Sequence, residues 1–317
     1  MDYLGHLRKA VEKRRDLFAL KGCTAFRLVN GEGDGLDGLT VDIYGEYLLA
    51  QCFSGSPGAD AARPTEALAR LADFLPLTVL GVLLKDRGRR HPGAKDIASF
   101  SESVLLYGEM PPEDYIVEQN GVRVAVDLVK GQNTGLFLDM REVRGRLAGL
   151  YGGVDSLLNL FCYTAVFSVH AILNGARSAV NVDLSKAVLG RARANYSING
   201  IEPDDRDFIR EDAQKWVKRA EKKGGRFSMV IFDPPTFARN KKKSFSARKD
   251  YAAFCALLSG LAGGGYVLTS VNAAGVTEND YRSFHPASWE LEFLSHESAD
   301  FPFRRRPYLK AGLWRVK

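Results

Sequence analysis

The sequence has little cysteine and no long apolar run. Its cysteines stand far apart, without the Cys-x-x-Cys or Cys/His spacing of a metal site: Cys23, Cys52, Cys162 and Cys255. This pattern excludes a disulfide framework and a zinc site, and it predicts reduced thiols and no bound metal. The longest apolar candidate, residues 75–84, is interrupted by a proline and is shorter than the about 18 residues that cross a membrane. Because the N-terminus also lacks the apolar core of a secretory signal, we expect a cytoplasmic protein with no membrane partner.

Three catalytic signatures are also missing. No Gly-x-Gly-x-x-Gly turn follows the apolar strand candidate at 156–160, so nothing there is arranged to cradle a dinucleotide pyrophosphate. The glycine- and acid-rich segment 31–38 lacks the Lys and Ser/Thr of a phosphate loop. Ser168 and Ser185 have no histidine and acid relay beside them, so hydrolase chemistry finds no support.

Length and charge indicate two globular domains that differ in charge. At about 150 residues a domain, 317 residues predict two domains, and 45% apolar with 26% charged residues is ordinary globular composition. Residues 1–115 carry 14 Lys and Arg against 17 Asp and Glu, whereas residues 116–317 carry 30 against 21. The basic excess of the second part favours a polyanion as partner, although a solvated basic face is the commoner origin of such clusters.

Residues 1–114 predict a small α+β domain. An amphipathic helix fits the first 20 residues, and the glycine-rich segment 30–38 fits a turn. Further along, the pattern predicts a helix over 59–74 and strands over 26–29, 47–53, 78–84 and 104–107. Pro111 and Pro112 mark a linker.

Residues 115–317 predict the second domain, a doubly wound α/β sheet. It opens with a β-hairpin over 115–128 that turns at Asn120-Gly121, a strong hairpin signal. Strands then alternate with helices, which is typical of a parallel sheet covered on both faces. The predicted strands are 156–160, 179–183, 207–210, 229–233 and 266–270, and the predicted helices are 164–174, 186–199, 214–222 and 250–261. Ligands of such sheets bind beyond the carboxyl ends of the strands, so the strand exits form the candidate site.

The first three strand exits suit a nucleoside without phosphate. Asn159 stands at the first exit, which has no pyrophosphate cradle. Asp183 ends the second strand, where a carboxylate can accept both hydroxyls of a ribose, or can cap the helix that begins near Ser185. Asp212 and Ala213 follow the third strand and could meet the edge of a purine, with helix capping an equal alternative.

The fourth strand exit has the most specific pattern. Asp233 is followed by Pro234 and Pro235, which fix the backbone and remove two N–H donors. The remaining carbonyl and carboxylate oxygens can orient the amine of a base, and Phe237 offers an aromatic face for stacking. The alternative is a strand that simply stops at prolines, with a buried Phe237.

A basic segment follows this exit directly and runs to residue 249. Basic side chains next to an aromatic ring match what single-stranded RNA recognition requires, whereas the alternative is a solvated loop. The residues concerned are Phe237, Arg239, Lys241, Lys242 and Lys243. Residues 303–310 and the four basic residues within 85–90 could add phosphate contacts.

Four motifs stand in order along the chain, at 27–42, 131–141, 159–164 and 233–237. Together they resemble the class I S-adenosylmethionine-dependent methyltransferases that modify bases of large-subunit ribosomal RNA. The resemblance runs from about residue 24 to the Tyr308-Leu-Lys310 segment, which is nearly the whole chain. It implies a Rossmann-like methyltransferase domain after a small α+β domain, S-adenosylmethionine as cofactor, and RNA of the 23S ribosomal type as partner.

The resemblance also implies a role for each matching residue. Asp183 would hold the ribose and Asp212 the adenine edge, while Asp233, Pro234 and Pro235 would form the catalytic loop at the target base. The sulfonium cation of the cofactor is stabilised by nearby acceptors and aromatic faces. The implied cofactor-binding residues are Gln132, Thr134, Arg141, Asn159, Phe161, Tyr163, Asp183, Ser185, Asp212, Ala213 and Asp233, and the substrate-binding residues are Phe237, Arg239, Lys241, Lys242 and Lys243.

Three departures from the family pattern bear on the chemistry. Ala165-Val166 stands where the family has two glycines, which could narrow the cofactor cleft. Family members often begin with an RNA-binding domain of the kind shared with pseudouridine synthases, whereas only a short helix is expected before the matching segment here, so we expect RNA capture to rest on the remaining basic surface. Asn272 stands where cytosine-C5 members carry the cysteine that attacks C6 of the base, and an amide cannot replace a thiolate.

We therefore expect an acceptor that needs no cysteine nucleophile, guanine N7 or an exocyclic amine rather than cytosine C5. N7 has an available lone pair and loses no proton, so positioning can suffice. Asn272 would then be a catalytic residue that orients the base, or else a turn residue, and Cys162 and Cys255 are predicted to be packing residues. Two other functions stay open: methylation of a protein or small molecule, and RNA binding on a degenerate methyltransferase scaffold. The sequence is compatible with an oligomer.

Overall fold

The computed structural model describes residues 2–53, 65–87, 102–235, 237–240, 243–303 and 306–317. The chain forms two compact units: Met1–Arg141 with Ser298–Arg305, and Glu142–Glu297 with Arg306–Lys317. Residues 298–305 thus leave the second unit and belong to the first. The predicted domains 1–114 and 115–317 stay a prediction, and the compact units divide the chain at Arg141 instead.

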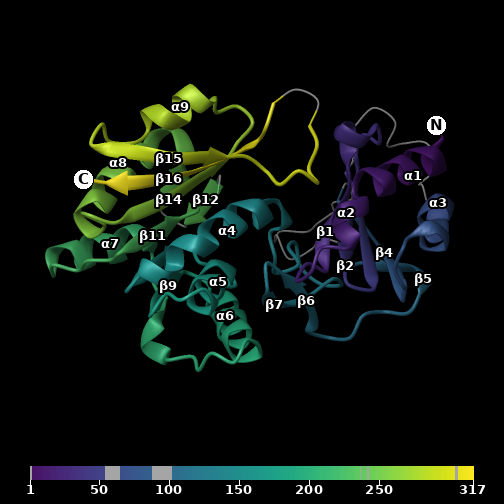
Figure 1. Ribbon diagram of the computed structural model, residues 1–317, viewed down its shortest axis with the longest axis horizontal. Coiled ribbons are helices and arrows are strands. Elements are labelled where there is room, and N and C mark those ends of the chain that lie inside the picture. Colours follow the sequence, from purple (N-terminus) through teal and green to yellow (C-terminus); the bar gives the residue numbers. More distant parts are fainter. Residues whose placement is uncertain (1, 54–64, 88–101, 236, 241–242, 304–305) are drawn as a thin grey trace. The chain divides into compact units, whose positions relative to one another are not determined.

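A five-stranded sheet forms the centre of the first unit (Figure 1). Strands β3 and β4 are parallel, and the other neighbours are antiparallel. Buried Leu7 and Ala10 of the first helix and Leu68 and Leu71 pack with apolar side chains of the sheet. In sheet order the strands are β1 (Ala25–Asn30), β2 (Leu39–Tyr44), β3 (Tyr47–Cys52), β4 (Gly81–Asp86) and β5 (Val104–Gly108), and the helices are α1 (Tyr3–Lys13), α2 (Arg15–Phe18), η1 (Gly31–Asp34), α3 (Thr65–Ala69), η2 (Arg70–Phe74) and η4 (Leu138–Met140).

The predicted hairpin forms, and it lies in the first unit. Strands β6 (Tyr115–Gln119) and β7 (Val122–Val126) are joined by Asn120 and Gly121, whose φ angles of 55° and 75° are those a two-residue turn requires. The Gln119 side chain donates from Nε2 to the carbonyl oxygen of Ala25 over 2.7 Å. This bond joins β6 to β1, which is why the hairpin packs with the first sheet.

The second unit contains the expected doubly wound sheet. Its order is β10-β9-β8-β11-β14-β16-β15, with the first five strands parallel and β16 antiparallel to both neighbours. Because the chain runs outward from β8 to β10 and then returns to the other side of β8, strand order reverses between β8 and β11. This confirms the fold class. The strands are β8 (Leu157–Leu160), β9 (Ala179–Asp183), β10 (Phe208–Arg210), β11 (Met229–Phe232), β14 (Tyr266–Asn272), β15 (Trp289–Ser295) and β16 (Leu309–Val316).

Helices cover this sheet in two groups. Helix α5 contacts α6, whereas α7 contacts α8 (Figure 1). The buried core includes Phe232 of β11 and Phe254 of α8, whose rings stack 4.4 Å apart. The helices are α4 (Arg141–Leu147), η5 (Ala148–Gly153), α5 (Val166–Leu173), α6 (Lys186–Ile198), η6 (Asp205–Asp207), α7 (Ala213–Lys222), α8 (Ala247–Leu261) and α9 (Glu278–Ser283).

Several strands were not expected from the sequence pattern. They are β2, β15, β16 and a short hairpin of β12 (Phe237–Asn240) and β13 (Lys243–Ser246), which lies where a basic loop was predicted. None of the helices in the described part of the chain has the length and apolar character needed to span a bilayer.

Candidate functional site

The turn after β8 has an unusual backbone. Phe161, Tyr163 and Ala165 all have left-handed φ angles, of 56°, 50° and 57°. Side chains other than glycine adopt this region at a cost of about 1–2 kcal/mol each, and such residues gather at functional sites. The amide of Cys162 donates to the carbonyl of Val182 over 3.1 Å, which holds the turn against β9. This hydrogen bond to β9 therefore keeps the turn in its strained conformation.

Asp183, the last residue of β9, accepts a hydrogen bond from this turn. Its Oδ2 accepts from the amide of Tyr163 (3.2 Å) and its Oδ1 from the amide of Ser185 (3.0 Å). Ser185 is the N-cap of α6, because its Oγ accepts from the amide of Val188 over 3.3 Å. Capping is thus done by Ser185 and not by Asp183. A carboxylate oxygen can accept more than one hydrogen bond. The half-buried Asp183 can therefore accept from two further hydroxyl groups.

Asn159 supports the turn from inside the protein. Its side chain is 2% exposed and donates from Nδ2 to the Oγ of Ser168 over 2.9 Å. Ser168 donates in turn to Asn181 over 2.6 Å, and Asn181 donates to the hydroxyl of Tyr196 over 2.9 Å. This buried chain joins β8, β9, α5 and α6, so Asn159 positions the strand exit through it.

The third exit is linked to the second. The amide of Glu211 donates to the carbonyl of Asp183 over 3.2 Å. Asp212 is the N-cap of α7, with its Oδ1 accepting from the amide of Lys215 over 3.1 Å, and Ala213 is buried. The capping alternative for Asp212 is therefore realised, and its second carboxylate oxygen is not used by that cap.

Asp233 leaves the sheet directly after β11. The hydroxyl of Ser270, on the neighbouring strand β14, donates to its Oδ1. The carbonyl of Ser270 accepts from the hydroxyl of Tyr251 over 2.9 Å. Pro234 is buried and Pro235 is exposed, so the loop turns outward at the second proline.

Asn272 ends β14 at the same edge of the sheet and is exposed. It lies opposite Leu309 of β16, and the amide of Ala273 donates to the carbonyl of Tyr308 over 2.9 Å. The buried Lys310 donates from Nζ to the carbonyls of Ala273 (3.2 Å) and Pro307 (2.9 Å). Because β11 and β14 are adjacent and parallel, Asp233 and Asn272 both leave the sheet at its carboxyl edge, with Asn272 two residues beyond Ser270, the hydrogen-bond partner of Asp233.

Neither cysteine near this edge is built as a nucleophile. Cys162 and Cys255 are both buried, and burial raises the pKa of each thiol above its ordinary value. Attack requires the thiolate, which burial disfavours. Among the described residues, no three His, Cys, Asp or Glu side chains gather in a way that could hold a metal ion.

The motif at 131–141 lies in the first unit. Gln132 is exposed, and the buried Thr134 shares a hydrogen bond with the hydroxyl of Tyr44 over 3.0 Å. Arg141 is 7% exposed and donates from Nη2 to the Oδ1 of Asp300 over 2.8 Å. Asp300 was not singled out in the sequence, since an acid in an irregular segment carries no pattern.

Lys85 of β4 corrects one expectation. It was grouped with basic residues that could contact phosphate, but it is 2% exposed and donates from Nζ to the carbonyl of Gly131 over 3.0 Å. Burial, together with the charge of Arg87, lowers the pKa of Lys85 to about 8. Arg87 donates to the carbonyl of Gln132. Both cations therefore hold the 131–132 loop.

The basic substrate segment is only partly described. Its backbone forms the antiparallel pair β12 and β13, which contain Phe237, Arg239 and Lys243. Lys241 and Lys242 lie outside the described residues.

Comparison with known proteins agrees with this geometry. Residues 36–286 match the family model of S-adenosylmethionine-dependent methyltransferases. The chain is 32% identical to a ribosomal RNA large subunit methyltransferase I of Shewanella denitrificans, over 98% of this chain and 79% of that protein. It is 35% identical to the corresponding protein of Aeromonas hydrophila, over 87% and 68%. A solved methyltransferase complexed with S-adenosylhomocysteine is similar with a TM-score of 0.86 and 29% identity, over 99% of this chain and 81% of that one.

The strand order and the polar strand exits define a class I methyltransferase sheet. With the family match, this chain belongs to the S-adenosylmethionine-dependent methyltransferase family. It is an enzyme whose methyl donor is S-adenosylmethionine.

Proposed function

We propose that this chain methylates a base of large-subunit ribosomal RNA in the cytoplasm, at guanine N7 or an exocyclic amine. The observation that carries the proposal is the presence of Asp233 and Asn272 at the exits of two adjacent strands, while Cys162 and Cys255 are buried. Relatives over most of the chain are named as methyltransferases of this RNA.

The residues present fit the cofactor. Asp183 keeps acceptor capacity for two ribose hydroxyls, and the turn at 161–165 has no glycine cradle for a phosphate, which suits an adenosine without phosphate. Tyr163 contributes an aromatic ring and Asp212 an acceptor at neighbouring exits of the same sheet edge, and Phe161, whose ring packs with those of Phe232 and Phe254, is proposed to line the cofactor site from the same turn. The resemblance to the family adds Gln132, Thr134 and Arg141 as proposed cofactor-binding residues.

Bound S-adenosylmethionine supplies an electrophilic methyl group. The chain's own task is to hold the base so that its nitrogen lone pair faces that group, since aligned approach is the main requirement of methyl transfer. Ser270 fixes Oδ1 of Asp233, and because a carboxylate can accept several hydrogen bonds, Asp233 can also accept from a base N–H. Pro234 and Pro235 keep this acceptor in place, and Asn272 orients the base from the next strand.

A nitrogen acceptor matches these groups better than carbon does. Cytosine C5 becomes nucleophilic only after a thiolate adds to C6. Cys162 and Cys255 are buried with raised pKa values, and Asn272 cannot act as a nucleophile of that kind. Guanine N7 needs no proton removal. An exocyclic amine loses a proton, and the Asp233 carboxylate is the proposed acceptor of that proton.

RNA binding is proposed for the segment from Phe237 to Lys243, including Arg239, Lys241 and Lys242. Neutralising several phosphates releases counterions, so affinity for RNA should fall with salt at a log–log slope of about 0.7 per contact. A flat salt dependence would speak for a small-molecule or protein substrate.

The deciding experiment supplies labelled S-adenosylmethionine and total RNA from cells that lack this protein, followed by nucleoside analysis. We expect label in 7-methylguanosine or an N-methylated base of large-subunit RNA. Label in 5-methylcytidine would overturn the argument from Asn272, and label only in protein would overturn the substrate class.

The cofactor site is tested by calorimetry with S-adenosylhomocysteine. Asp183→Ala should abolish measurable binding, because it removes the proposed ribose acceptor. Asp155→Ala is the matched control, since Asp155 precedes the same sheet at the amino end of β8 and makes an exposed ion pair with Arg177. Equal loss in both variants would contradict the site.

A further inference from the structure

The segment between β15 and β16 carries a buried acid, Asp300, to which the proposed methyltransferase site assigns no role. Asp300 is 2% exposed, although it lies in an irregular stretch, residues 298–303, that belongs to the first unit. Its Oδ1 accepts from Nη2 of Arg141 over 2.8 Å, and its Oδ2 accepts from the backbone amide of Arg27 over 2.8 Å. One carboxylate thus joins β1 to the arginine at the start of α4.

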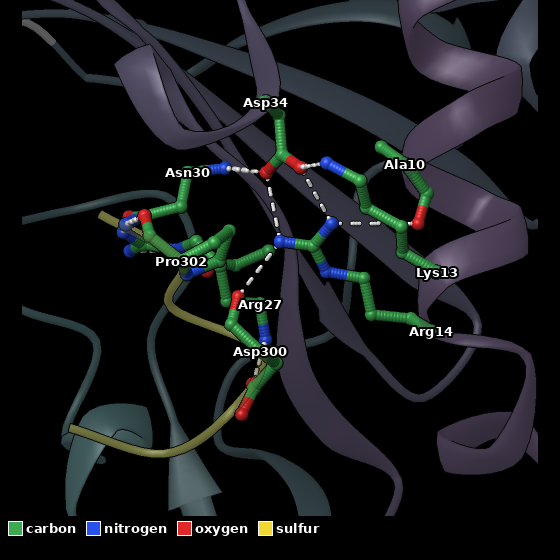
Figure 2. Close-up of polar contacts among 9 residues, drawn as sticks. Ala10, Lys13, Arg14, Arg27, Asn30, Asp34, Asp300 and Pro302 are labelled. Atoms are coloured by element: carbon green, nitrogen blue, oxygen red, sulfur yellow. Dashed lines mark hydrogen bonds and ion pairs between the residues drawn. The ribbon is translucent and has the colours of Figure 1, made fainter. Parts of the chain in front are cut away.

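The main chain of this segment is fixed independently of Arg141. Arg14 donates from Nη2 to the carbonyl of Asp300 over 2.9 Å, and Asn30 donates from Nδ2 to the carbonyl of Pro302 over 2.9 Å (Figure 2). The guanidinium of Arg27 lies 4.5 Å from the ring centre of Phe301. The segment that carries the Asp300 carboxylate is therefore held in place by contacts other than the one with Arg141.

Arg14 is itself held on its other side. It donates from Nη1 and Nη2 to the two oxygens of Asp34 over 2.8 and 2.7 Å, and Figure 2 shows its guanidinium between Asp34 and Asp300. Burial alone would raise the pKa of Asp34, but the hydrogen bonds and charge of Arg14 bring that pKa below its ordinary value. The Asp34 carboxylate is therefore ionised at neutral pH and stays a charged partner of Arg14.

The start of α4 is joined to the same segment. Ser298 donates from both its amide and its Oγ to the carbonyl of Asp139, each over 2.9 Å. Asp139 stands two residues before Arg141, so the backbone that carries this arginine and the carboxylate that binds its guanidinium are fixed to one another. Two anchors leave the guanidinium little rotational freedom.

We propose that Asp300 is a positioning residue that holds the Arg141 guanidinium in the orientation used for S-adenosylmethionine. This inference rests on the proposed cofactor role of Arg141. An arginine whose planar donors are bound on one edge presents its remaining donors in a fixed direction, which lowers the ordering cost when a ligand binds. Without the carboxylate, the guanidinium loses its charge-assisted bond at Nη2 and with it this constraint on its orientation.

The test compares two substitutions in the same buried network, Asp300→Asn and Asp34→Asn. Each exchanges a carboxylate for an isosteric amide beside an arginine, so both lower stability, but only the first loosens Arg141. S-adenosylhomocysteine affinity should fall about tenfold in Asp300→Asn and stay within about twofold in Asp34→Asn, because a charge-assisted bond is lost at Arg141 only in the first. Equal weakening in both, or wild-type affinity in folded Asp300→Asn, would overturn the inference.

A double-variant cycle separates positioning from general damage. If Asp300 acts through Arg141, then adding Asp300→Asn to Arg141→Met should weaken binding no further than Arg141→Met alone. Additive losses would contradict this. If Arg141→Met binds like the wild type, the cofactor role of Arg141 and this inference both fail while the methyltransferase proposal stands; if the wild type itself does not bind, the cofactor site fails as a whole.

A measurement without ligand completes the test. The side-chain Nη2–Hη2 signal of Arg141 in a 15N-labelled chain, assigned by its absence in Arg141→Met, should be protected from water exchange in the wild type and in Asp34→Asn, because this is the nitrogen that donates to Asp300. It should be lost in Asp300→Asn. Should that variant not fold, Asp300→Glu keeps the charge and moves the carboxylate by one methylene, and it should give the same loss. Retention of the signal in either folded Asp300 variant overturns the inference.

Discussion

Ser270 donates a hydrogen bond from its hydroxyl to Oδ1 of Asp233, across the boundary between β14 and β11. Its own carbonyl accepts from the hydroxyl of Tyr251, a fully buried residue whose ring centre lies 5.0 Å from that of Phe232. The carboxylate of the Asp-Pro-Pro loop is thereby tied to the hydrophobic core of the second unit. The orientation of Asp233 is thus set by the fold and not by the loop alone.

Ser270→Ala should lower kcat by about tenfold while leaving the KM for S-adenosylmethionine within about twofold, because the variant removes the hydroxyl that orients the Asp233 carboxylate but keeps the charge of Asp233. Steady-state kinetics on the RNA substrate measure both parameters. Ser259→Ala is the control: Ser259 also uses its hydroxyl in one side-chain hydrogen bond, to Nε1 of Trp289 over 2.9 Å, away from the strand exits. Unchanged kcat in Ser270→Ala would show that the loop orients Asp233 unaided.

Acid should destabilise the chain through two buried histidines. Burial lowers the pKa of His285 to about 4, against hydrogen bonds that raise it, and burial together with Arg144 lowers the pKa of His170 to about 4. The unfolded chain binds these protons near pH 6.5, so between about pH 6.5 and 4 the unfolded state holds more protons and stability falls as pH falls. The loss for each histidine should be on the order of 3 kcal/mol at the lower end of this window.

Urea unfolding at a series of pH values measures this effect. His170→Leu removes one of the two neutral imidazoles, so its stability should decline less steeply than that of the wild type between pH 6.5 and 4. Carboxylates contribute equally to both curves, and the difference between them isolates the histidine. Parallel curves would mean that His170 is not held neutral in the folded chain.

Two glycines should respond in opposite directions to alanine. A Cβ at Gly33 would stand 2.0 Å from the carbonyl oxygen of Pro302, whereas a Cβ at Gly190 in α6 meets nothing within 4 Å. Gly33→Ala should cost about 1–3 kcal/mol of unfolding free energy through overpacking. Gly190→Ala should add about 0.5–1 kcal/mol, because alanine loses less entropy in a helix. Urea denaturation of both variants measures the two changes in unfolding free energy. Stabilisation by Gly33→Ala would show that the backbone at Pro302 moves aside at little cost in free energy.

The parallel part of the second unit could be predicted from sequence because each strand is short, apolar and stopped by a polar residue. The predicted strands at 179–183 and 229–233 differ from β9 and β11 by one residue at most. Strands β15 and β16 escaped notice since their pairing is set by contact with each other and with β14, not by a local stop signal. Asn120-Gly121 predicted the β6–β7 hairpin, but not the isolated bridge between Gln119 and Cys23, which precedes β1.

The candidate site divides in the same way. Asp183 and Asp233 stand at strand exits and could be located from the ends of apolar runs. Their supports could not: Ser270 lies inside an ordinary strand, and Asp300 lies in an irregular stretch 159 residues from Arg141. Such partners depend on which distant segments the fold brings together, and a single sequence contains no record of that.

Ala165 allows the glycine departure to be tested directly. This residue is fully buried and has a φ of 57°, where the family motif carries glycine. Ala165→Gly should leave stability within about 1 kcal/mol of the wild type, because relief of the left-handed strain offsets the loss of a buried methyl group. Ala165→Val should cost at least about 2 kcal/mol, since a β-branched side chain is disfavoured at positive φ and the site has no spare room.

Urea unfolding measures the stability of both variants. S-adenosylhomocysteine calorimetry on Ala165→Gly shows whether the methyl group narrows the cofactor cleft, in which case the affinity of this variant should rise. A stable Ala165→Val variant would mean that the turn relaxes out of the left-handed region, and the strained backbone would then not be a fixed part of the site.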